Sequence, residues 1–113
     1  MERREHRRVP VCYLSTFSTD EKKTVSNAVV LDLSLGGCRV HSFALVDPGT
    51  QVDLQIALPN YPAPFVVKQA RVRWAREREF GVSFIRLHPE DQKPLRRLMS
   101  LVRARERIFS AGV

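Results

Sequence analysis

The feature that most constrains the fold is a series of short segments with a two-residue hydrophobic period, which runs from Val9 to Leu87. The clearest of them spans residues 51–58, where every second residue is a large aliphatic one: Val52, Leu54, Ile56 and Leu58. Successive side chains of an extended chain point to opposite faces, so this pattern is typical of a strand with one face in a core. Strands of this kind must bury their apolar faces against one another.

Further segments with strand-like residues cover 9–17, 25–33, 38–43, 65–74 and 80–84. Polar, glycine-containing or proline-rich stretches separate the strands, at residues 20–23, 34–37, 47–49, 59–64 and 76–79. At the second of these turns, Gly36 and Gly37 are expected to adopt backbone angles that are closed to other residues. Six short antiparallel strands with one apolar face each are buried most economically by closing into a small barrel. The sequence therefore predicts an all-β fold built on a six-stranded antiparallel β-barrel.

After Pro89 the hydrophobic period becomes helical. Apolar residues recur at spacings of three, four and seven: Leu95, Leu98, Met99, Val102 and Phe109. Asp91 is expected to cap this helix, with Pro94 in its first turn. We expect a C-terminal helix over about residues 89–110, packed on one end of the barrel. A chain of 113 residues fits a single domain with one core, covering residues 1–113.

The charge of the chain favours anionic partners. Nineteen Lys and Arg against twelve Asp and Glu give a formal net charge of +7, which attracts nucleotides, nucleic acids or acidic surfaces alike. Arginines crowd both ends of the chain: Arg3, Arg4, Arg7, Arg8, Arg96, Arg97, Arg103, Arg105 and Arg107. Two solvated, positively charged tails would also explain this distribution of arginines, so the charge alone does not identify a partner.

Several classes of protein are disfavoured. The start of the chain is charged where a secretion signal would be apolar, and only Cys12 and Cys38 are present, which predicts a reduced, cytoplasmic setting. No apolar run approaches the roughly 20 residues that cross a bilayer, so no membrane insertion is expected. The cysteines and the three histidines match no common zinc spacing, so no metal is expected.

The sequence also argues against catalysis. Ser34 and Asp32 are two residues apart on a strand end, with neither a histidine partner nor an oxyanion motif beside them. No glycine-rich loop followed by lysine is present to hold a nucleoside triphosphate. We therefore expect a binding protein that is not an enzyme and has no cofactor.

Two segments together carry a family resemblance. Residues 4–10 read Arg-Glu-His-Arg-Arg-Val-Pro, and residues 32–37 read Asp-Leu-Ser-Leu-Gly-Gly. They resemble the two signature motifs of the PilZ domain family, Arg-x-x-x-Arg before a strand and Asp/Asn-x-Ser-x-x-Gly at the end of the next strand. Arg4 and Arg8 match the first motif, and Asp32, Ser34 and Gly37 match the second. Arg3 and Arg7 offer an alternative register at the same spacing, but Val-Pro follows Arg8 directly, as in the family pattern.

The resemblance implies a PilZ-type barrel that binds the bacterial second messenger cyclic di-GMP as a receptor. It implies a flexible ligand-binding arm over residues 1–10, and signalling by a conformational change to an unidentified downstream protein. The implied ligand-binding residues are Arg3, Arg4, Arg8, Asp32, Ser34, Gly36, Gly37 and Trp74. An arginine directly before the first motif, here Arg3, is associated in this family with two intercalated cyclic di-GMP molecules per chain.

The chemistry of these residues fits such a ligand. A guanidinium pairs bidentately with phosphate or with guanine O6 and N7, and it stacks on a purine face. The opposite guanine edge displays two donors, which the Asp32 carboxylate would accept, while Ser34 would add a hydroxyl contact. Gly36 and Gly37 would let the backbone and the ligand approach closely. Without the arginine motif, residues 32–37 would read as a simple turn.

Trp74 has two expected positions, in the barrel core or at the wall of the ligand pocket, and the resemblance favours the second. Two other functions stay open. A small basic barrel can bind single-stranded nucleic acid, although the few aromatic residues here form no evident stacking platform. A PilZ domain that serves only as a protein-interaction adaptor would have lost motif residues, and none of the five matched positions is lost.

Overall fold

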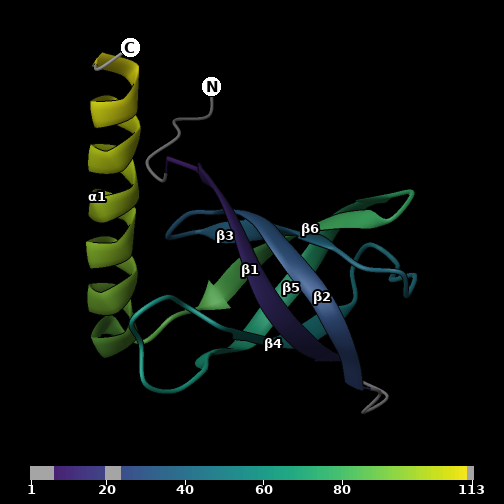
Figure 1. Cartoon of the computed structure of the whole chain (residues 1–113). Helices are drawn as coiled ribbons and strands as arrows, with labels where there is room; N and C mark the ends of the chain where they lie inside the picture. The colour runs from purple at the N-terminus through teal and green to yellow at the C-terminus, as the bar shows by residue number, and fades with distance from the viewer. Residues whose placement is uncertain (1–6, 20–23, 112–113) are drawn as a thin grey trace, which may run out of the picture.

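The computed structural model describes residues 7–19 and 24–111, and within them all side chains except those of residue 26 and residues 106–111. The elements follow the chain as β1 (Val9–Thr19), β2 (Thr24–Leu33), β3 (Gly37–His41), β4 (Gln51–Ile56), β5 (Phe65–Arg76), β6 (Glu79–Arg86) and α1 (Pro89–Ala111). The six strands form a closed antiparallel barrel in the order β1-β2-β3-β6-β5-β4 (Figure 1). The predicted six-stranded barrel with a C-terminal helix is confirmed.

Pairing of β1 with β4 closes the barrel. Ser15 of β1 lies opposite Ile56, and Thr19 lies opposite Val52. On its other side β1 pairs with β2, and this pairing has two irregularities in register. Irregularities of this kind bend a strand, which helps β1 to pair with β2 and β4 at once. Closure leaves no long free strand edge, which would otherwise be open to pairing with another chain.

The predicted alternation places one face of each strand in a common core. In β4 the residues Val52, Leu54 and Ile56 are buried, and those between them are not. Two aromatic rings meet inside the barrel, where Phe17 and Phe80 pack edge to face with ring centroids 5.2 Å apart. The outward faces of the strands are thereby left to carry polar side chains.

Helix α1 runs beside one end of the barrel (Figure 1). It packs there through Leu95, Leu98 and Met99, which are all buried. The helix begins at Pro89, and the carbonyl of His88 accepts the amides of Asp91 and Gln92. Asp91 therefore lies inside the first turn instead of capping it, because the missing amide of proline suits the first helical position. No helix in the described part of the chain is long and apolar enough to cross a membrane.

Candidate functional site

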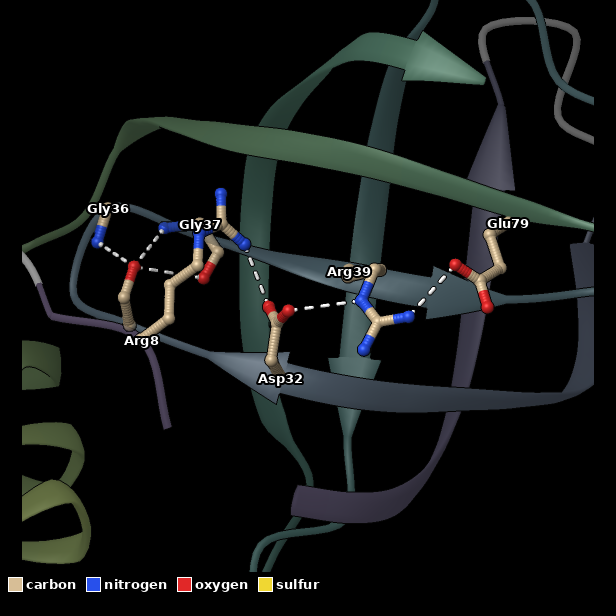
Figure 2. A network of polar contacts seen from close by, with 7 residues as sticks. Arg8, Asp32, Gly36, Gly37, Arg39 and Glu79 are labelled. Atoms are coloured by element: carbon tan, nitrogen blue, oxygen red, sulfur yellow. Dashed lines mark hydrogen bonds and ion pairs between the residues drawn. The ribbon is translucent and has the colours of Figure 1, made fainter. Parts of the chain in front are cut away.

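Four charged side chains form a line on the outer surface of the barrel (Figure 2). Arg8 donates from Nη1 to Asp32 Oδ1 at 2.7 Å. Arg39 donates from Nε to the other oxygen, Asp32 Oδ2, at 3.1 Å, and from Nη1 to Glu79 Oε1 at 2.9 Å. We call Arg8, Asp32, Arg39 and Glu79 the charged line. It unites the end of the first sequence motif with the start of the second.

Strand register explains why these residues meet. Asp32 pairs with Arg39 across β2 and β3, and Arg39 pairs with Gly81 across β3 and β6. Gly81 in turn pairs with Trp74 of β5. Asp32, Arg39, Gly81 and Trp74 therefore form one row across four neighbouring strands. Along β2, β3 and β6 the neighbouring residues Leu33, Cys38, Val40, Phe80 and Val82 are buried, so the row faces outward.

Asp32 is the centre of the line. Its side chain is 17% exposed, whereas that of Arg8 is 40% exposed. Each carboxylate oxygen accepts from one guanidinium and keeps the capacity to accept a second donor, so a ligand donor can join or replace one of these partners. Hydrogen bonds to Glu79 and then to Asp32 raise the pKa of Arg39, which fixes its positive charge. Arg39 is also held by Glu79, so Arg8 is the partner that is freer to leave.

Sequence reasoning missed Arg39 and Glu79. The signal was present in the alternation of β3, because Cys38 and Val40 are core residues and the residue between them must face outward. The short turn after Leu33 then brings that residue opposite Asp32. The position of Glu79 is set by the two-residue hairpin between β5 and β6. In this hairpin Arg76 pairs with Glu79, and Glu77 has a positive φ of 55°.

Ser34 holds the turn between β2 and β3. Its side chain is buried, and its Oγ accepts the amides of Gly36 and Gly37, each at 3.1 Å. The same hydroxyl donates to the carbonyl of Gly37 at 3.2 Å. The hydroxyl is thus committed to the backbone, and the structure gives Ser34 the role of shaping the turn beside Asp32.

Gly37 matters because of the limited space around it and not because of an unusual backbone angle. Among the described glycines only Gly49 has a positive φ, so the expectation of special angles at Gly36 and Gly37 is wrong. A Cβ on Gly37 would collide with the carbonyl oxygen of Val82 and lie 3.2 Å from the Cα of Ser83. Gly37 is buried, and the close approach that it permits is that of β3 to β6.

This contact makes Gly37→Ala a test of the turn. The colliding atom belongs to the backbone of β6, which has to shift to make room. We expect the substitution to lower the free energy of unfolding by about 1–3 kcal/mol, as overpacking does in other cores. Urea denaturation followed by circular dichroism measures it, with Gly49→Ala as a comparison that is strained by its φ of 92° but meets no neighbouring atom. Equal stability of Gly37→Ala and the wild type would contradict the packing argument.

Trp74 does not lie in the barrel core. It is 37% exposed, and its indole covers Gly81, since a Cβ on that glycine would meet the ring. The core position is therefore wrong, because the irregular register between Val72 and Trp74 turns this side chain outward. The ring lies on the same row as Asp32, separated from it by Arg39 and Gly81.

Cys38 lies beneath the charged line. Burial raises the pKa of its thiol well above the ordinary value, the Asp32 carboxylate raises it further, and Arg8 opposes the shift. A thiol kept protonated in this way behaves as a core residue and not as a nucleophile. In the described ranges no group of three or more His, Cys, Asp and Glu side chains is placed to hold a metal ion. Arg3 and Arg4, the remaining predicted site residues, lie outside the described residues.

The fold and the site together define a class of protein: a small antiparallel barrel with a line of arginines and carboxylates on its outer surface. The family model described as the PilZ domain matches residues 2–101, which is most of the chain. The chain belongs to the PilZ domain family.

Solved structures share this fold at low sequence identity. The PilZ domain of CeSA from a cellulose-synthesizing bacterium is 19% identical, with a TM-score of 0.64 over 88% of this chain and 98% of that one. The inhibitor of motility MotI/DgrA of Bacillus subtilis is 20% identical, with a TM-score of 0.69 over 95% and 53% of the two chains. YcgR of Escherichia coli, solved in complex with c-di-GMP, is 22% identical, with a TM-score of 0.75 over 98% and 51%.

The chain thus spans about half the length of MotI/DgrA and YcgR, but nearly all of the CeSA domain. A search of curated proteins gives no match.

Proposed function

We propose that this protein is a receptor for cyclic di-GMP that binds the ligand on the charged line. The observation that carries the proposal is the 2.7 Å contact between Arg8 and Asp32, which joins the ends of two motifs that lie 24 residues apart. Membership of the PilZ family supports it. Further support comes from YcgR, a protein of the same fold whose structure contains c-di-GMP.

The chemistry of binding follows from an exchange of partners at Asp32. Arg8 leaves the carboxylate and applies its planar fork to a phosphate or to the O6 and N7 edge of a guanine. The vacated Asp32 oxygen accepts the N1–H and N2 donors of a guanine. Arg39 stays beside Asp32, because Glu79 holds its other guanidinium nitrogen at 2.9 Å. The ion pair of the unliganded surface is thereby replaced by two charge-assisted contacts to the ligand.

The other predicted site residues complete this surface. Arg3 and Arg4 supply further guanidinium groups from the segment before β1. Ser34, Gly36 and Gly37 act by fixing the turn that presents Asp32, and the half-covered indole of Trp74 forms the far wall of the site. Ligand binding then changes the path of the chain before β1, and a protein partner in the bacterial cytoplasm reads that change. The module is not catalytic.

Calorimetric titration of the whole chain with cyclic di-GMP tests the proposal. GTP and a short single-stranded DNA oligonucleotide serve as anionic comparison ligands, and Trp74 fluorescence is a second readout. We expect saturable binding of cyclic di-GMP, at most weak binding of GTP, and a change in emission because the indole borders the site. Tighter binding of the oligonucleotide than of cyclic di-GMP would replace the proposal with a nucleic-acid function.

The stoichiometry is a separate prediction, and it depends on Arg3. Two intercalated cyclic di-GMP molecules concentrate four phosphates, and a third guanidinium both offsets that charge and caps the stack of guanines. We expect the titration to end at two ligands per chain in the wild type and at one in Arg3→Leu. The protein concentration has to be well above the dissociation constant, so that the endpoint reports the ratio. An endpoint of two in both proteins would remove Arg3 from the determining role.

A further inference from the structure

A groove runs between α1 and the loop that follows β4, and none of its lining residues belongs to the charged line. It has a volume of about 230 Å³ and lies among Tyr13 of β1, the loop residues 58–61 and the face of α1 that carries Arg97, Leu101 and Arg105. The loop swings from the barrel toward α1 (Figure 1). Cavities that hold drug-sized ligands are usually about 300–1,000 Å³. This groove is smaller, and its size suits one large apolar side chain.

The floor of the groove is apolar, and part of it faces solvent. Leu58 and Leu98 are buried at its base. Leu101 is 58% exposed and Tyr61 is 37% exposed, and both line the opening. Large apolar side chains that are exposed around one hollow mark a site of association more often than scattered ones do.

Two cations flank this apolar floor. Arg97, Leu101 and Arg105 are spaced by four residues each, which places them on one face of α1. At 1.5 Å per residue, the two arginines are about 12 Å apart along the helix axis. Neither makes an ion pair with another residue in the described part of the chain. From residue 92 to residue 105 the helix contains no acidic residue, and Glu106 is the first one after this stretch.

Tyr13 adds a polar group at the edge. Burial raises the pKa of its phenol and the nearby Arg105 opposes that shift, so the hydroxyl stays protonated at neutral pH and can both donate and accept. The groove therefore combines an apolar floor, a neutral hydroxyl and two positive charges.

We propose that this groove binds an acidic peptide segment of a partner protein, in which one apolar side chain lies between two carboxylates. In an extended peptide, residues i, i+2 and i+4 point to the same side, and the outer two are about 13 Å apart. This spacing matches that of the two arginines. A nucleic acid fits less well, because it needs an open stacking surface and not a hollow for one side chain. The inference concerns a surface separate from the charged line and does not rest on cyclic di-GMP binding.

Titration of the full chain with a synthetic peptide tests the proposal, in the absence of any nucleotide. The probe has the core Glu-Ser-Phe-Ser-Glu, and the reference peptide has the core Lys-Ser-Phe-Ser-Lys. Binding is followed by NMR shifts of the methyl groups of Leu58, Leu98 and Leu101. We expect the acidic peptide alone to shift these methyl groups. Arg97→Glu and Arg105→Glu should each weaken its binding by about tenfold or more, as loss of a charge-assisted contact does.

Arg96→Glu is the matched control, since Arg96 is exposed on the same helix but does not line the groove. It carries the same change of charge and should alter the affinity by about twofold at most, through long-range charge alone. Leu101→Ser should remove the apolar contact without loss of folding, as judged by circular dichroism, because the side chain is mostly exposed. The Arg97→Glu, Arg105→Glu double variant should bind the lysine peptide instead.

Three results would overturn the proposal. The acidic peptide could leave the three methyl groups unshifted at millimolar concentration. Arg96→Glu could weaken binding as much as Arg97→Glu does, which would indicate diffuse attraction to the helix. A single-stranded oligonucleotide or an anionic phospholipid vesicle could bind α1 more tightly than the peptide, which would assign the basic face to another kind of partner.

Discussion

Arg8→Ala is expected to reduce the affinity for cyclic di-GMP by about a hundredfold, because a bidentate charged contact contributes about 2–3 kcal/mol to binding. The fold should survive, since the Arg8 side chain is 40% exposed and an ion pair of this kind adds at most about 1 kcal/mol to stability. Isothermal titration calorimetry measures the affinity, and thermal unfolding measures the stability. Arg4→Ala is expected to lose affinity to a similar degree.

Arg7→Ala is the control that decides the register of the motif. Arg7 is exposed and neighbours Arg8 in sequence, but it is Arg8 that contacts Asp32. We expect Arg7→Ala to bind nearly as the wild type does, and Arg8→Lys to recover only part of the affinity, since an ammonium lacks the planar fork. Strong loss in Arg7→Ala with normal binding in Arg8→Ala would assign the motif to Arg3 and Arg7. Normal binding in both Arg4→Ala and Arg8→Ala would refute the proposed site.

Asp32→Ala is expected to weaken binding of cyclic di-GMP by about a hundredfold while leaving any weak binding of cyclic di-AMP unchanged or slightly stronger. The carboxylate reads the N1–H and N2 donors, a pair that adenine lacks. Its removal also releases Arg8, which is then free to contact the phosphates of either ligand. Parallel titrations with the two cyclic dinucleotides give the ratio of affinities that reports base selection.

Glu79→Ala serves as the control for this selection. It removes the other carboxylate bound to Arg39 but does not contact Arg8. We expect a smaller loss of affinity and an unchanged preference for guanine. If Asp32→Ala weakened both ligands equally, Asp32 would act by holding the arginines in place and not by reading the base.

Much of the fold could be predicted because its physical causes are local. The alternation at Val52, Leu54 and Ile56 sets which face of a strand is buried, whatever the strand pairs with. The change of period near Pro89 likewise marks the start of the helix. The details that the sequence left open depend on neighbours distant in sequence. Trp74 faces outward because of an irregularity in the pairing of β5 with β6, and no local pattern specifies it.

The sequence by itself determined the barrel, the helix and the two motifs, because these follow from hydrophobic period and from residue types at fixed spacing. Only the tertiary structure decided which role each motif residue has. It showed Ser34 committed to the turn, Gly37 required by β6, and Asp32 already shared between Arg8 and Arg39. The physical reason is that hydrogen-bond partners and close approaches are set by strand register, which joins residues far apart along the chain and is fixed only when the barrel closes.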